Sequence, residues 1–123
     1  MDISGLQRET FEVWTPFLDG KVKIRYVSRA ELFTINSQAT RNTWDKGHQL
    51  QKEHDPIKAD IFLGRAAVKG WEGFTMNGEA YPYTEQNCDF LMGKWVDFAR
   101  FVNEICIDLQ ALMDAEAAAE EKK

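Results

Sequence analysis

The stretch WVDFARFVNEICIDLQALM (95–113) carries the strongest structural pattern in the chain. Its apolar residues recur three and four positions apart, as they do on one face of an α-helix, and polar residues lie opposite. The apolar set is Trp95, Phe98, Ala99, Val102, Ile105, Cys106, Leu109, Leu112 and Met113. Phe101 widens this stripe, and Ile107 falls on the polar side. We therefore predict a long amphipathic helix, which Gly93 separates from a short helix before it.

A stretch near the start, TFEVWTPFLDGKVKIRYV (10–27), has the pattern of a β-hairpin. Apolar and basic residues alternate over Val22–Tyr26, which is the period of a strand with one buried and one exposed face. Asp19-Gly20 before them is a hairpin turn signal. The partner strand contains Pro16, which cannot donate a backbone hydrogen bond, so we expect that strand at the edge of a small sheet.

Capping residues mark three further helix starts. Ser28 and Glu31 match the capping box, in which each side chain accepts a hydrogen bond from the other residue's backbone. Asp55-Pro56 places an N-cap acceptor before a proline at the first helical position. Thr84 is expected to cap a third helix.

Two connections differ in composition. RNTWDKGHQLQKEH (41–54) is polar and contains a glycine, so we expect a loop or a weak helix there. GWEGFTMNGEAYPYT (70–84) instead crowds aromatic residues among glycines. We expect Gly70 to end the preceding helix in a left-handed conformation and Asn77-Gly78 to close a two-residue turn. The aromatic rings would then pin the connection over the helix ends.

These elements predict one mainly α (α+β) domain, in which a small N-terminal β-hairpin is followed by a compact bundle of three to five helices. A chain of 123 residues is long enough to bury a hydrophobic core without disulfides or metals. We expect a flexible N-terminus over residues 1–9 and a single globular domain over 10–113. Residues 114–123 lack large apolar side chains and are expected to form a frayed, charged helical tail.

Charge and composition exclude several classes of function. The formal net charge of −5 disfavours nucleic acid and anionic membrane surfaces, because both attract basic proteins. The sequence shows no signal peptide and no apolar run of the roughly 20 residues that span a bilayer. Cys88 and Cys106 lie far apart in the sequence and are expected as reduced thiols. We therefore expect a cytoplasmic protein.

Candidate catalytic and metal-ligating residues are few. His48 and His54 lie at a spacing that does not place both on one helix face, so we interpret them as solvated histidines and not as metal ligands. No serine or cysteine has the neighbours of an activated nucleophile, and Gly70–Gly73 lacks the Lys-Ser/Thr of a phosphate loop. We expect no enzyme activity, no cofactor and no metal.

Five stretches occur in order along the chain and cover roughly residues 18–110. They are GKVKIRYVSRAEL, ATRNTWD, DPIKADIFLGRAAVKGWEG, GEAYPYTEQNCDFLM and WVDFARFVNEIC. Together they resemble the tail assembly chaperones of long-tailed bacteriophages and prophages. In that resemblance, Gly70, Trp71, Glu72 and Gly73 form a family landmark at the end of a helix.

The resemblance implies a non-catalytic chaperone that binds and solubilises the tape-measure protein during tail assembly. Such a protein acts in the cytoplasm of the bacterial host and is absent from the mature virion. The family also implies a longer product made by ribosomal frameshifting, through which the tail-tube protein would be a second partner. Two alternatives stay open: a structural tail or head-tail connector component that remains in the virion, and a small enzyme or regulator.

The long helix is our candidate for recognition. Its apolar stripe reaches past Leu109 to Leu112, and Phe101 and Ile107 extend beyond one core-facing strip. We predict that Phe101, Ile105, Ile107, Leu109 and Leu112 include contacts to a partner helix, from the tape-measure protein or from a second copy of the chain. The alternative is that the whole stripe is core, since most helices are stabilised by burying an amphipathic face.

Overall fold

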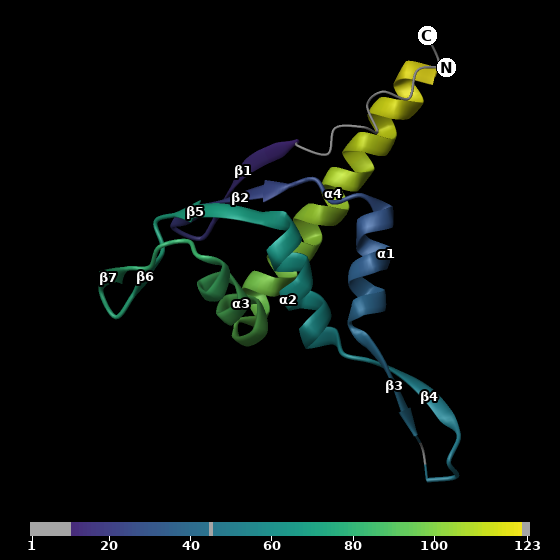
Figure 1. The fold of residues 1–123 in the computed structure, drawn as a ribbon. Coiled ribbons are helices and arrows are strands. Elements are labelled where there is room, and N and C mark those ends of the chain that lie inside the picture. Colours follow the sequence, from purple (N-terminus) through teal and green to yellow (C-terminus); the bar gives the residue numbers. More distant parts are fainter. Residues whose placement is uncertain (1–10, 45, 122–123) are drawn as a thin grey trace.

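The helices lie on one side of a three-stranded sheet, and two small hairpins project from this body (Figure 1). The computed structural model of the chain describes residues 11–44 and 46–121, with side chains as far as residue 115. The strands are β1 (Glu12–Phe17), β2 (Gly20–Arg25), β3 (Thr40–Trp44), β4 (Leu50–His54), β5 (Val68–Glu72), β6 (Thr75–Met76) and β7 (Glu79–Ala80). The helices are α1 (Arg29–Gln38), α2 (Pro56–Ala67), α3 (Glu85–Lys94) and α4 (Val96–Glu121).

The main sheet has the order β1-β2-β5, and both pairings are antiparallel. β1 and β2 form the predicted hairpin, with Phe17 opposite Gly20. Its two-residue turn is therefore Leu18-Asp19, one position before the predicted turn. Pro16 lies in β1, at the edge of the sheet as predicted.

The third strand of this sheet was not predicted. α2 ends at Ala67, and Val68 leaves it directly in an extended conformation, with φ −83° and ψ 121°. Gly70, which we expected to end the helix in a left-handed conformation, lies inside β5 opposite Lys23. Val68 is fully buried. Packing of β5 against β2 therefore ends the helix before the glycine.

The polar stretch 41–54 forms most of a second sheet, so the predicted loop or weak helix is wrong. β3 and β4 pair antiparallel, from Thr40 opposite His54 to Trp44 opposite Leu50. This hairpin points away from the body in Figure 1. Every residue of β4 is exposed. Because both faces of the hairpin meet solvent, its sequence lacks the alternation that identifies a half-buried strand.

The fold class is α+β, which corrects the prediction of a mainly α domain with one small hairpin. The described residues contain four helices and seven strands, and the strands form three small sheets. β6 and β7 make the third sheet, a short projecting hairpin. The helices pack against one another, and α2 and α4 also pack on the main sheet.

The predicted helix caps are confirmed. The hydroxyl of Ser28, the carboxylate of Asp55 and the hydroxyl of Thr84 each accept a hydrogen bond from a backbone N–H in the first helical turn. The break between the last two helices lies later than expected. α3 continues through Gly93, and the chain turns at Trp95, which has an extended conformation with φ −108° and ψ 98°.

The core is organised around Phe98 of α4, which is fully buried. Its ring contacts the rings of Phe17, Trp71, Phe74 and Trp95, with centroid distances between 5.7 and 6.1 Å. Further along α4, the Gln110 side chain donates a 3.1 Å hydrogen bond to the carbonyl of Val27. α4 therefore joins the sheet to the chain that leads into α1.

Arg25, at the end of β2, connects three elements. Its Nε donates to the carbonyl of Ala66 at 3.0 Å, and its Nη2 contacts Glu31 of α1 at 2.6 Å. The hydrogen bond from Arg25 lowers the pKa of the Glu31 carboxyl, and partial burial opposes this effect. The ionised form of Glu31 is therefore favoured in the folded state.

Glu31→Gln is expected to remove about 1 kcal/mol of stability at neutral pH. A lowered folded-state pKa stabilises the protein above the unfolded-state pKa, and this contribution is lost as the pH falls through the folded-state pKa. The expected effect is small because about a third of the Glu31 side chain is exposed and solvent weakens the ion pair. Urea unfolding of both proteins at pH 7 and at about pH 3 measures the difference, which should be smaller in acid.

The matched control is Glu53→Gln. Glu53 pairs with Arg41 at 3.4 Å, but both side chains are more than half exposed. This substitution should change the free energy of unfolding by less than about 0.5 kcal/mol at either pH. Equal effects of the two substitutions would contradict the role assigned to Arg25 and Glu31.

Candidate functional site

The aromatic crowding of residues 70–84 has a structural explanation centred on Trp71. The Trp71 side chain is only 7% exposed. Phe74 stacks on it at a centroid distance of 5.0 Å, and Tyr83 meets it edge-on at 5.2 Å. The Trp71 indole N–H donates a 2.7 Å hydrogen bond to the carbonyl of Tyr81. The segment is thus clamped to the core through one tryptophan.

The other landmark residues have separate roles. Glu72 forms an ion pair with Lys21 at 3.2 Å, and since both side chains are more than half exposed the pair contributes little stability. Gly73 has a φ of +84°, and a Cβ atom there would lie 3.0 Å from the Cα of Gly20. Only glycine therefore lets this segment approach the β1–β2 turn so closely.

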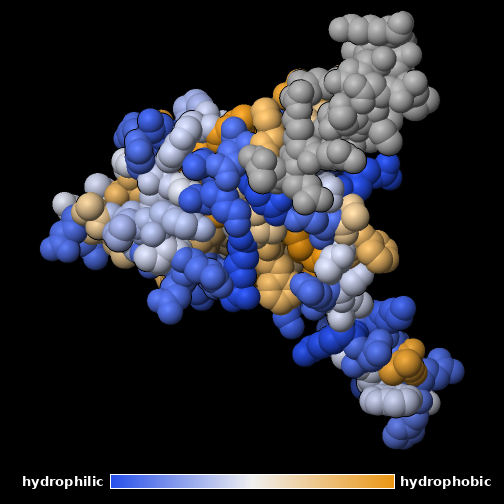
Figure 2. Space-filling view, turned by 45° about the horizontal axis from the view of Figure 1, so that its top comes forward, coloured by the Kyte–Doolittle hydropathy of each residue, from blue (hydrophilic) through white to orange (hydrophobic). Residues whose placement is uncertain are grey.

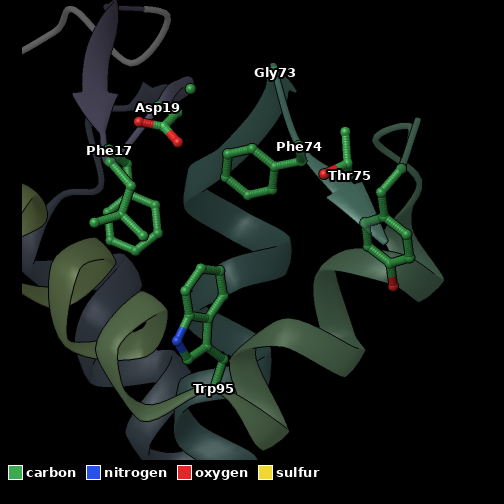
Figure 3. A pocket seen from close by; sticks show the side chains of 9 residues that line it. Phe17, Asp19, Gly73, Phe74, Thr75 and Trp95 are labelled. Atoms are coloured by element: carbon green, nitrogen blue, oxygen red, sulfur yellow. The ribbon is translucent and has the colours of Figure 1, made fainter. Parts of the chain in front are cut away.

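A pocket of about 160 Å³ opens beside this close approach (Figure 3). Phe17, Phe74, Tyr81 and Trp95 contribute aromatic side chains to its wall. In Figure 3, the rings of Phe17, Phe74 and Trp95 surround the space, and Asp19 lies above Phe17. Asp19 is the only charged residue among the described residues that line the pocket.

The predicted recognition residues of α4 differ in burial. Leu109 is 6% exposed and belongs to the core. Phe101 and Ile105 are half-buried and pack against the core, and the Phe101 ring lies 4.6 Å from that of Phe17. Ile107 and Leu112 are 63% and 45% exposed. Contacts of these residues to a partner stay a prediction. Leu109 has almost no free surface for such a contact.

The same residues do not form one continuous surface. With 3.6 residues per turn, Leu112 lies about 80° to one side of the helix face centred on Val102. Phe101 and Ile105 lie on that same side, whereas Ile107 lies about 140° to the other side. A single straight partner helix would contact one of these flanks and not both. We call Phe101, Ile105 and Leu112 the α4 flank.

Several exposed apolar residues outside the α4 flank were not predicted from the sequence. Ile57 and Val96 are 58% and 66% exposed and line a second hollow, of about 450 Å³, between α2, α3 and α4. Figure 2 shows hydrophobic surface on one face of the body among hydrophilic residues, and also on the projecting β3–β4 hairpin, where Leu50 is exposed. Exposure of this kind depends on tertiary packing, so no sequence pattern could have located it.

The described residues offer little reactive chemistry. Cys88 and Cys106 are free and buried, and burial raises the pKa of each thiol to about 12, so neither is a thiolate near neutral pH. Both histidines are exposed in the β3–β4 hairpin: His48 in the connection between the strands and His54 at the end of β4. In residues 11–44 and 46–121, no group of three or more His, Cys, Asp or Glu side chains is placed to hold a metal ion.

No helix within the described part of the chain is long and apolar enough to cross a membrane. Comparison of the chain with protein-family models, with curated proteins and with solved structures finds no match.

Proposed function

We propose that this protein is a phage tail assembly chaperone that binds and solubilises the tape-measure protein without catalysing a reaction. The ordered sequence motifs that resemble this family support the proposal. The observation that carries it is the α4 flank, where Phe101, Ile105 and Leu112 present apolar surface in one row beside the core.

The flank suits an apolar helical partner. Phe101, Ile105 and Leu112 have the spacing of one helix face, so a second helix can pack along them in the helix-in-groove manner. Asp108 lies among them and is exposed. The net charge of −5 makes complexes that contain many copies of the chain repel one another, which keeps them soluble. An aggregation-prone apolar helix would therefore be covered by a partner with a charged outer surface.

The proposal includes a place and a time of action. The chaperone would act in the bacterial cytoplasm before tail-tube polymerisation and would be absent from the mature virion. A frameshifted longer form would recruit the tail-tube protein. Mass spectrometry of purified particles separates this function from that of a structural component, because a structural component would be found in the particles.

The substitution Leu112→Asp tests the α4 flank directly. We expect it to abolish co-purification with a co-expressed tape-measure protein, because a charge would be buried against an apolar helix. Folding should change little, since Leu112 is 45% exposed. The measurements are the amount of soluble tape-measure protein retained and thermal unfolding of the purified variant.

Two other substitutions are matched controls. Ile107→Asp introduces the same charge on the opposite flank, where the side chain is 63% exposed, and should leave both folding and co-purification unchanged. Leu109→Ala should instead lower the free energy of unfolding by about 2–5 kcal/mol, because Leu109 is core. If folded Leu112→Asp retains the tape-measure protein as well as the wild type, the flank is not the binding site.

A further inference from the structure

The pocket beside Gly73 has a composition that selects one kind of ligand. Four of its nine described lining residues are aromatic, and the Asp19 carboxylate is the only charged group among them. The nearest basic residue in sequence, Lys21, does not line it; its ammonium pairs with Glu72 at 3.2 Å and lies 5.1 Å from the centre of the Trp14 ring. The pocket is therefore aromatic with a net negative charge.

The Asp19 carboxylate is available to a ligand. No hydrogen bond or ion pair joins its side chain to another residue in the part of the chain that the structure describes. Aromatic faces attract cations through the quadrupole of the ring, and a carboxylate forms its strongest hydrogen bonds with charged donors. The two features together favour a cation over a neutral or anionic ligand.

The residue before Asp19 supplies apolar surface at the pocket. Leu18 lines the pocket, is 76% exposed and has a φ of 52°. A leucine with positive φ in a two-residue turn is strained, and the exposed side chain gains little from core packing in return. Such a residue can cover the aliphatic stem of a ligand that enters between the turn and the rings.

We propose that this pocket binds an arginine side chain of a partner protein. A volume of about 160 Å³ suits one side chain and is small for a cofactor or metabolite. The planar guanidinium stacks on aromatic rings and donates two parallel hydrogen bonds to a carboxylate, which a lysine ammonium cannot do. Arginine therefore matches the rings, Asp19 and Leu18 at once.

No residue of the α4 flank lines the pocket, although the Phe101 ring lies 4.6 Å from the ring of Phe17, which does. The inference goes beyond the proposed function and does not depend on it. Loss of tape-measure binding in Leu112→Asp would say nothing about the pocket, because arginine binding is measured without the tape-measure protein.

NMR titration of the full chain with N-acetyl-arginine amide tests the proposal. We expect the indole N–H resonance of Trp95 to shift, with a dissociation constant on the order of millimolar for so small a ligand, and the Trp44 resonance to stay unchanged. The neutral isostere N-acetyl-citrulline amide should bind about three- to tenfold more weakly. Arginine affinity should also fall as the salt concentration rises.

The variant Asp19→Asn isolates the carboxylate, and asparagine is tolerated in turns, so the hairpin should fold. We expect it to weaken arginine binding about threefold or more and to remove the preference over citrulline. Asp108→Asn, an exposed acidic residue outside the pocket, should bind arginine as the wild type does. Equal binding of citrulline and arginine, unchanged arginine binding by Asp19→Asn, or no shift of Trp95 would each overturn the proposal.

Discussion

Replacing Trp71 by Ala is expected to lower the free energy of unfolding by about 4 kcal/mol. The substitution removes a nearly buried indole, its stacking on Phe74 and its contact with Phe98. It also leaves the carbonyl of Tyr81 without the indole N–H as donor. Urea unfolding followed by circular dichroism measures the loss, which should be visible as a lower midpoint with little change in slope.

Trp44→Ala is the matched control for this prediction. Trp44 is 70% exposed in β3 and lies opposite Leu50 of β4. Removal of the Trp44 side chain should lower the free energy of unfolding by less than about 1 kcal/mol, the usual contribution of a cross-strand pair. If the two tryptophan substitutions destabilise the protein equally, Trp71 does not clamp residues 70–84 to the core as described.

Replacing Gly73 by Ala is expected to lower the free energy of unfolding by about 3 kcal/mol. One part of this cost is the positive φ of 84°, which a residue with a Cβ atom adopts unfavourably. The other part is steric, since the Cβ atom would lie 3.0 Å from the backbone Cα of Gly20. Backbone atoms cannot move aside as the end of a flexible side chain can.

Gly78→Ala separates these two contributions. Gly78 has a φ of 80°, but a Cβ atom there would meet nothing within 4 Å. This substitution should lower the free energy of unfolding by only about 1–2 kcal/mol, which is the cost of the positive φ alone. Unfolding of both variants by urea gives the difference. If Gly73→Ala lowers the free energy of unfolding no more than Gly78→Ala does, the segment around Gly73 can move away from the β1–β2 turn without loss of stability.

Local signals in the sequence predicted the parts of the fold that depend on neighbouring residues. Ser28, Asp55 and Thr84 cap helices because each bonds to backbone groups within three positions. Pairing between distant segments was harder to predict. β5 was missed because it follows α2 without a loop and contains Gly70, and its strand character depends on β2, more than 40 positions earlier in the chain.

The candidate surfaces also combine features that neighbouring residues determine with features that depend on distant segments. The 3.6-residue period located α4 and its core face correctly, but it could not separate Leu109, which is buried, from Leu112, which is half-exposed. That difference depends on where the packed body ends along the helix. The pocket was missed altogether, because Asp19, Phe74 and Trp95 come from three segments that only tertiary packing brings together.

The order of the elements along the chain affects how the protein folds during synthesis. β2 is made early, yet its neighbour β5 and the covering residue Phe98 follow about 45 and 75 positions later. The buried face of the hairpin therefore leaves the ribosome without its partners, and the closure of two long loops must precede any stable sheet. Folding is thus completed only after most of α4 has been translated, and until then the nascent chain exposes the apolar side of β2 to other proteins.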